Sequence, residues 1–475
     1  MRQNDEPIWN HVDAKRETFV ALSDRIWGMP ELNYAEHRSA EEHRKTLEAE
    51  GFRVTTGLAG IPTAVMGEAG DEGPVIAILG EYDALPGLSQ EAGVAEHRPV
   101  EAGGPGHGCG HNLLGSAAML AATAVKDWLA AHGVKGRVRY YGCPAEEGGS
   151  AKAFMARDGI FSDVDVAISW HPAHFSGVGK AKSLAMTIID FAFAGRAAHA
   201  AAAPHLGRSA LDAVELMNVG VNYMREHMPD GARIHYAVLD SGGIAANVVQ
   251  AHAKVRYIVR AADIGQLKAL AERVRKVADG AALMTETRVE TTVIAGMSNL
   301  LGNRPLERTM HENLMRLGPP DFDAEDRALA AQFQATLAPE DISSAFEAQG
   351  LPVEAGQPLC DAVLPLERGG IGGIGSTDVG DVSWVVPTVQ AWGATLAIGT
   401  PFHSWQFTGQ GKAAAAHKGL VHVAKVMAGT AVDLLRDEDL RTAVAAEFAE
   451  RRGPNGYECP IPPEVAPALD MSRAG

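Results

Sequence analysis

The chain contains 475 residues, of which 46% are apolar and 21% are charged, and its formal net charge is −17. This length usually corresponds to more than one domain, and the composition is typical of a soluble globular protein. The acidic balance argues against nucleic acid or an anionic membrane surface as a partner, since both attract basic proteins, but it does not exclude a small anionic substrate.

The N-terminal segment, the apolar runs and the cysteines bear on location. Residues 1–17 lack the apolar core of a signal peptide. The longest apolar run, residues 113–125, is stopped by Lys126 and Asp127 before it could span a bilayer. The four cysteines are widely spaced and form no CxxC pair, so they are not a disulfide framework. We therefore expect a cytoplasmic protein.

The first part of the chain alternates helical and strand-like patterns. Two amphipathic segments within residues 11–50 predict helices, and a long apolar helix is expected over 112–133. Short, nearly continuous apolar runs predict buried strands. These runs lie at residues 74–80, 137–143, 164–170 and 394–400. The pattern predicts an α/β fold, with a mostly parallel sheet covered by helices on both faces.

Residues 184–296 interrupt this rhythm. They predict the order strand, helix, strand, strand, helix, strand, which is the ferredoxin-like βαββαβ motif. The expected elements are 184–195, 207–228, 232–240, 247–260, 263–282 and 286–294. We therefore expect a catalytic domain in two parts, 1–183 and 297–475, with an inserted α+β domain over 184–296.

The segment "GPGHGCGHNLLG", residues 104–115, spaces His107, Cys109 and His111 by single glycines just before the predicted helix. Alternate residues of an extended segment face the same side, so these side chains could converge on one object. Two interpretations are open at this point: a cysteine nucleophile beside a histidine base, or a cluster of metal ligands.

Polar side chains follow the predicted buried strands. In open α/β sheets, ligands bind beyond the carboxyl ends of the strands. The residues found there are Glu81, Asp83, Glu146, Glu147, His171 and His403. Together with Cys109 and His111, they offer thiolate, imidazole and carboxylate donors, which suit Zn²⁺ or a similar divalent ion. The donors are too many for one tetrahedral ion and suggest two ions, as in aminopeptidase-type hydrolases.

Two rival classes of protein fit these residues less well. A cysteine hydrolase would use Cys109 with His107 or His111, but it leaves Glu146, Glu147 and both strand-end histidines without a role. A non-catalytic binding protein would be expected to lack the base or some of the ligands. A metal-dependent enzyme therefore accounts for these residues better than either a cysteine hydrolase or a non-catalytic binding protein.

Five segments also carry a resemblance: "GEYDALPG", "GHGCGHN", "PAEEGGSAK", "ISWHP" and "STDVGDVSW…GTPFHSW". In this order they resemble the metallopeptidase and amidohydrolase family of aminoacylases, glutamate carboxypeptidases and indoleacetyl-amino-acid hydrolases. The likeness extends over almost the whole chain. It implies a two-metal catalytic domain, with Zn²⁺ or Mn²⁺, and an inserted lid domain that dimerises.

The resemblance also implies individual roles. Glu146 would be the general base, and Asp83 takes the position of the aspartate in the family's first motif. Glu81 stands where many members have a histidine ligand, and Asn112 stands where many have aspartate. The implied metal ligands are Cys109, His111, Glu147, His171 and His403.

On the lid, the resemblance implies that Asn247 and Arg260 hold a substrate carboxylate and that His199 stabilises the developing oxyanion. The implied reaction is hydrolysis of the amide of an N-acyl or aryl-acyl amino acid such as p-aminobenzoyl-glutamate. The alternative within the family is a dipeptidase or N-acyl-amino-acid deacylase. The expected assembly is a homodimer through the lid, with a related second subunit as a further partner.

Overall fold

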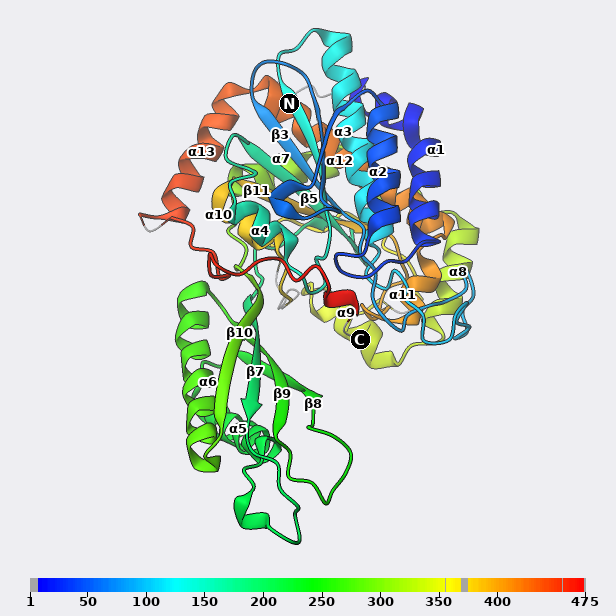
Figure 1. Ribbon diagram of the computed structural model, residues 1–475. Coiled ribbons are helices and arrows are strands. Elements are labelled where there is room, and N and C mark those ends of the chain that lie inside the picture. Colours follow the sequence, from blue (N-terminus) through cyan, green and yellow to red (C-terminus); the bar gives the residue numbers. More distant parts are fainter. Residues whose placement is uncertain (1–6, 355, 369–374, 455, 474–475) are drawn as a thin grey trace.

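The computed structural model describes residues 7–354, 356–368, 375–454 and 456–473. Two sheets organise the chain, and Figure 1 shows them as two lobes, with the smaller one projecting below the larger. The larger lobe holds a seven-stranded sheet of order β1-β2-β4-β3-β5-β11-β6, and the smaller holds a four-stranded sheet of order β10-β7-β9-β8. The α/β prediction is confirmed.

The central sheet is parallel where it is buried and antiparallel at its edges. Strands β4, β3, β5 and β11 pair in parallel, whereas β1, β2 and β6 join antiparallel. Strand β3 is buried at every residue, as expected for a strand covered on both faces. The strands are β1 Arg53–Thr56, β2 Val65–Ala69, β3 Val75–Glu81, β4 Arg137–Cys143, β5 Val166–Ala173, β6 Gly177–Val178 and β11 Thr388–Ala394.

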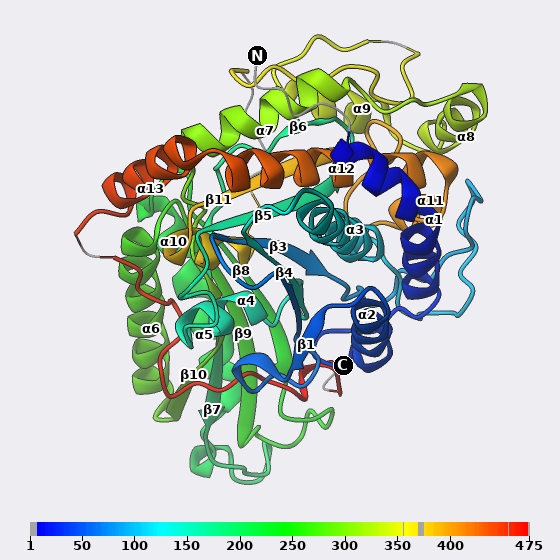
Figure 2. The same ribbon diagram turned by 90° about the horizontal axis from the view of Figure 1, so that it is seen from above.

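Helices cover both faces of this sheet, as Figure 2 shows from above. On one face, α3 packs with α1 and α12 around a large apolar cluster, while α4 and α10 belong to a second cluster on the other face. The helices are α1 Pro7–Trp27, α2 His37–Ala49, α3 His111–His132, α4 Ala151–Arg157, α7 Arg304–Leu317, α8 Ala324–Gln334, α9 Pro339–Glu347, α10 Val379–Val385, α11 Trp405–Gln410, α12 Ala414–Arg436 and α13 Glu438–Arg452.

Helix α3 is the core helix of the larger lobe. Within the described ranges it is the one helix whose length and composition would allow a membrane crossing, but 83% of its most apolar window is buried inside the protein. Small residues let it approach the sheet closely: a Cβ added at Gly115 would lie 2.4 Å from the carbonyl oxygen of Glu81. This contact places the start of α3 beside the end of β3.

The smaller lobe has its own apolar cluster between its sheet and two helices. Its elements are β7 Ala185–Ala194, α5 Ala210–Met224, β8 Arg233–Asp240, β9 His252–Ala261, α6 Ile264–Thr285 and β10 Arg288–Met297. The order β10-β7-β9-β8, with antiparallel pairing throughout, is the ferredoxin-like arrangement that the sequence predicts. We call this lobe the lid.

Two strand predictions were wrong in position. Residues 395–400 form no strand, and β11 ends at Ala394, because the apolar run there is the buried loop that leads to α11. Residues 247–251 are loop rather than strand, and β9 starts at His252. Asn247 therefore lies in a loop, and His403 lies nine positions beyond the end of its strand.

Candidate active site

Two close approaches shape the loop that carries Cys109 and His111. A Cβ at Gly106 would lie 2.0 Å from the carbonyl oxygen of Leu88. Gly110 has a left-handed backbone (φ 77°), and a side chain there would meet Phe407 and Pro172. The left-handed turn starts α3 at His111, so Cys109 and His111 both reach the carboxyl end of the sheet.

His107 does not join them, although the alternation would have allowed all three side chains to converge. Its Nε2 lies 3.1 Å from the carbonyl oxygen of Ile26, and the ring is buried against α1. Asn112 is likewise structural: its Nδ2 donates to Ser23 Oγ at 3.0 Å and to the Gly411 carbonyl. Neither residue faces the cluster described below.

Asp83 orients His111. Its Oδ1 accepts a hydrogen bond from His111 Nδ1 at 2.8 Å, and both side chains are fully buried. A proton held at Nδ1 leaves Nε2 with a lone pair, which is the form that binds a metal. The other oxygen of Asp83 accepts the backbone N–H of Glu147 at 2.9 Å, so one carboxylate positions two further donors.

Glu146 and Glu147 lie on a tight loop after β4. Ala145 has a left-handed backbone (φ 54°), which is costly for a non-glycine residue and must be held by its surroundings. This turn directs Glu147 toward His111, at 4.0 Å, and toward His403, at 3.2 Å, while Glu146 lines the adjoining cavity. Both side chains face the same centre, as the strand ends predict.

His171 and His403 complete the cluster. His171 is in β5, and its Nε2 lies 3.4 Å from Cys109 Sγ. His403 is half-exposed, and its backbone N–H donates to the Gly108 carbonyl at 2.9 Å, which ties the loop after β11 to the loop of Cys109. The five side chains implied as ligands, Cys109, His111, Glu147, His171 and His403, therefore come together.

Their spacing fits two ions that share one ligand. Cys109, His111 and His171 offer donor atoms within 4.8 Å of one another, and so do Cys109, Glu147 and His403. Two donors on one zinc ion, each about 2.0–2.3 Å from it, lie roughly 3.2–3.6 Å apart. The 3.4 Å between Cys109 and His171 and the 3.2 Å between Glu147 and His403 fall in this range.

Unsatisfied buried atoms support the same interpretation. His111 Nε2 and Glu147 Oε1 are buried and have no hydrogen-bond partner. Buried polar atoms without partners are rare, and a bound ion is one of the accepted explanations. The donor set and the unpaired atoms therefore fit divalent metal.

The electrostatics oppose a cysteine nucleophile. Burial, followed by the nearby Glu147 carboxylate, raises the pKa of the Cys109 thiol well above its usual value. A catalytic thiol needs the opposite, namely an electropositive setting that lowers its pKa. A divalent cation reverses this balance and deprotonates a coordinating thiol. Burial, together with the charges of Glu81 and Glu147, also raises the pKa of Glu146.

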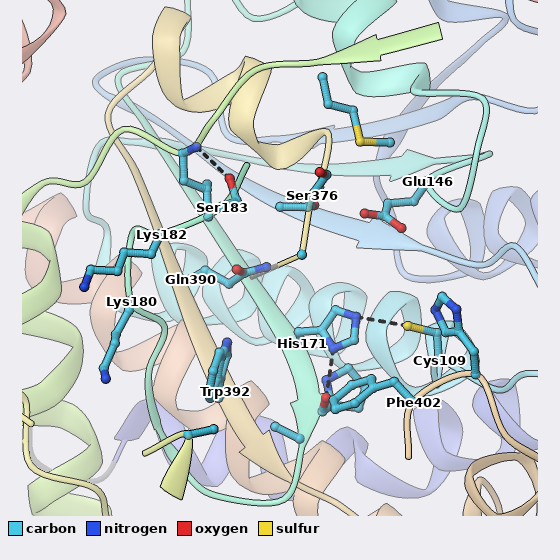
Figure 3. A pocket seen from close by; sticks show the side chains of 18 of the residues that line it. Cys109, Glu146, His171, Lys180, Lys182, Ser183, Ser376, Gln390, Trp392 and Phe402 are labelled. Atoms are coloured by element: carbon cyan, nitrogen blue, oxygen red, sulfur yellow. Dashed lines mark hydrogen bonds between the residues drawn. The ribbon is translucent and has the colours of Figure 1, made fainter. Parts of the chain in front are cut away.

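A cavity of about 540 Å³ opens onto the cluster and extends to the lid. In Figure 3, Cys109, Glu146 and His171 lie on one side of the view, and Lys180, Lys182 and Trp392 lie on the other. Arg260, on β9 of the lid, also lines this cavity, and its Nε is buried without a hydrogen-bond partner. The cavity thus joins carboxylates and metal donors to cationic and aromatic walls.

His199 and Asn247 do not reach this cavity within the chain. Both are exposed in neighbouring loops of the lid, where His199 pairs with Val248 and the Asn247 carbonyl accepts the N–H of Ala200 at 3.0 Å. The Nδ1 of His199 accepts the backbone N–H groups of Ala201 and Ala202. With Nδ1 as the acceptor, the N–H of the ring lies at Nε2, where it can act as a donor.

Sequence reasoning missed three buried charged residues near the centre. Lys152 and Asp378 are fully buried and paired, and Glu36 accepts the backbone N–H of Ala145. Lys152 and Asp378 stand inside the quoted motifs "PAEEGGSAK" and "STDVGDVSW", which was the available signal. Glu36 had none, because its partner is a backbone group more than a hundred residues away.

The sequence profile of the peptidase family M20/M25/M40 matches residues 77–471. The chain belongs to this family. It is 45% identical over 469 residues to a subunit of the p-aminobenzoyl-glutamate hydrolase of Escherichia coli K12, covering 96% of this chain and 97% of that protein. It is 28% identical over 452 residues to the mouse Xaa-Arg dipeptidase, covering 92% and 90%.

Among solved structures of the M20 family, one described as a dinuclear metal-binding peptidase, the Bacillus subtilis YXEP protein, has the same fold. It superposes with a TM-score of 0.57 at 18% identity, covering 89% of this chain and 99% of that one. The family profile and the E. coli relative confirm the expected family and class of enzyme for this chain, and its clustered donors are candidate metal ligands.

Proposed function

We propose that this protein is a metal-dependent amidohydrolase that cleaves the amide bond of an aryl-acyl amino acid of the p-aminobenzoyl-glutamate type. Cys109 would be shared by two divalent ions, Zn²⁺ or Mn²⁺. His111 and His171 would hold one ion with it, and Glu147 and His403 the other. The observation that carries the proposal is the convergence of these donors around Cys109, with Glu146 beside them.

Glu146 would do the proton transfers. When bound, the two ions polarise the amide carbonyl and make water acidic enough to react at neutral pH. Glu146 would accept the proton of the attacking water and deliver it to the leaving amine, as a general base and then a general acid. Asp83 would keep His111 in its ligating tautomer and hold the loop of Glu147 through their shared hydrogen bonds.

The cavity favours an anionic, aromatic substrate. Arg260, Lys180 and Lys182 line it and would attract a free carboxylate, for which a planar guanidinium is well suited. Trp392 and Phe402 offer flat apolar surfaces for an aryl group. The same cations disfavour the cationic side chain of an Xaa-Arg dipeptide, so we place the dipeptidase alternative second.

The lid would complete the site of a second copy of the chain. We assign 1–183 and 297–475 to the catalytic domain and 184–296 to the lid, in line with the separate apolar clusters of the two sheets. His199 and Asn247 are exposed and away from their own cavity, so they would serve the cavity of a partner in a homodimer. The E. coli relative is named as one subunit of its hydrolase, so a related second subunit is a further proposed partner.

A cytoplasmic location is part of the proposal. All four cysteines are free, and Cys109 must stay reduced to bind metal.

The decisive experiment is a substrate panel on purified, metal-loaded protein, in which the acyl group and the amino acid vary independently. Aryl-acyl glutamates should be cleaved with the highest kcat/KM, and amidation of the free carboxylate should lower it markedly. Preference for Xaa-Arg dipeptides would transfer the assignment to the alternative. No amide hydrolysis across the panel would reject both.

A further inference from the structure

Glu81 belongs to a buried network of charges at the end of β3. Its side chain is almost fully buried, and its Oε1 lies 2.6 Å from Lys152 Nζ. Lys152 also contacts Asp378 at 2.7 Å, and neither of these two side chains is exposed. Lys152 thus fixes one oxygen of Glu81 and determines where the other oxygen points.

That second oxygen faces His111. Glu81 Oε2 lies 3.2 Å from His111 Nε2, and both atoms are buried without a hydrogen-bond partner. Asp83 accepts the Nδ1–H of His111, so in the neutral ring Nε2 carries a lone pair that can bind metal. The imidazole lone pair and the carboxylate oxygen are both metal donors, and at this separation they could bind the same cation.

The charge balance points the same way. Lys152 supplies one positive charge beside the two buried carboxylates of Glu81 and Asp378. Buried carboxylates are costly unless cations face them, and a divalent ion is an efficient counter-charge. Glu81, His111 and Glu146 offer donor atoms within 4.8 Å of one another, close enough to contact one ion.

We propose that Glu81 is a sixth protein ligand of the metal centre, bound through Oε2 to the ion that His111 holds, with Lys152 as the residue that positions it. The 3.2 Å separation from His111 Nε2 equals that between Glu147 and His403 and is the spacing of two donors on one ion. This inference rests on the proposed metal-dependent function.

The test is metal binding, measured apart from catalysis. Apoprotein prepared with chelator is titrated with Zn²⁺, and the bound ions are counted and their affinities measured by competition with a chromophoric chelator. Wild-type protein should bind two ions per chain. Glu81→Gln should bind one of them about 100-fold or more weakly, beyond the 10–100-fold range expected when an outer-sphere partner is lost.

Asp381→Asn is the matched control. Asp381 is also a fully buried carboxylate, but it accepts hydrogen bonds from Ser298 and Tyr457 and does not face the cluster. It should keep both ions at wild-type affinity. Two ions of unchanged affinity in Glu81→Gln would overturn the inference, whereas a wild-type chain that binds no ion would reject the proposed function itself.

A second measurement needs no variant, which matters if Glu81→Gln does not fold. In a crystal structure of the zinc-loaded wild-type protein, anomalous scattering locates the ions. A Glu81 oxygen within about 2.0–2.2 Å of an ion would confirm ligation. An oxygen more than about 3 Å from every ion would refute it, even with both ions in place.

Discussion

Glu36 and Ala145 are joined by a hydrogen bond that connects the loop before α2 to the loop of the two glutamates. Glu36 Oε1 accepts the backbone N–H of Ala145 at 2.9 Å, and the carboxyl group is fully buried. Ala145 has the left-handed backbone that directs Glu146 and Glu147 toward the site. Tyr34 adds a second link, because its hydroxyl donates to the Gly149 carbonyl at 2.6 Å.

Removal of this link should lower turnover without removing metal. Burial, followed by the charge of Asp83, raises the pKa of Glu36 to about 8, so the group is largely neutral at pH 7. Glu36→Gln keeps a neutral acceptor and should retain most activity. Glu36→Ala leaves the Ala145 N–H unpaired and should lose about 100-fold in kcat, the cost of a misplacement near 1 Å. Equal kcat in the two variants would reject this role; metal content serves as the control.

Variants of Glu146 and Glu147 should differ in how much metal the protein binds. Glu146→Gln should keep its ions and lose about two to four orders of magnitude in kcat, the usual contribution of a positioned base. Glu147→Gln should lose metal as well, because its carboxylate lies 3.2 Å from His403 within one donor group. Elemental analysis measures the metal bound by each variant, and steady-state kinetics measures its kcat. Equal metal and equal activity would show the roles to be wrongly assigned.

Metal should stabilise the fold. An ion that binds only the folded chain adds about 4 kcal/mol to the free energy of unfolding at a concentration 1,000 times its Kd. Apoprotein should therefore melt at a lower temperature than protein with Zn²⁺ or Mn²⁺ and should be inactive in chelator. Full activity in excess chelator, with no change in Tm, would contradict a metal-dependent mechanism.

His43 should make the fold sensitive to acid. It is completely buried with its Nδ1 2.7 Å from the Tyr140 hydroxyl, and burial, with a smaller effect of Arg25, lowers its pKa to about 3. The unfolded chain therefore binds a proton, below about pH 6.5, that the folded chain does not. Stability is complete above that pH and falls by up to about 1.4 kcal/mol per unit as the pH decreases toward 3.

Denaturant unfolding at pH 7, 6 and 5 measures this slope. His43→Gln should be less stable at pH 7 but should lose less stability on acidification than the wild type. The same replacement at the exposed His235 serves as the control for the loss of a surface histidine. A wild-type slope in His43→Gln would show that other groups govern the acid response.

His199 should act on a partner's site. His199→Ala and Glu146→Ala should each be nearly inactive as homodimers. Mixed dimers, formed by co-expression with different tags, should contain one complete site, since the chain that keeps Glu146 receives His199 from the other chain. With random assortment about half of the dimers are mixed, and about a quarter of wild-type activity should return. An isolated mixed dimer no more active than its parents would rule out the shared site.

The local sequence pattern was enough to predict the fold class and the set of candidate metal-binding side chains. Nearly continuous apolar runs predicted β3, β4 and β5, because strands buried on both faces carry apolar side chains at most positions. Strand ends converge at one edge of a parallel sheet, so the residues after them could be grouped before any contact was known. The same reasoning failed at 394–400, where a buried loop has the apolar composition of a strand.

Only the tertiary structure decided which of the candidates face one another. His107 and His111 look equivalent in sequence, yet the left-handed turn at Gly110 separates them, so that His107 contacts Ile26 and His111 faces Glu81. Lys152 contacts Glu81, and Glu36 accepts a hydrogen bond from Ala145, so both contacts join residues far apart in the chain. The spacing of residue types along the sequence does not reveal such contacts. Residue type and spacing determine which donor groups the chain can offer. The packing of α3 against the end of β3 determines which of these donors lie together at the site.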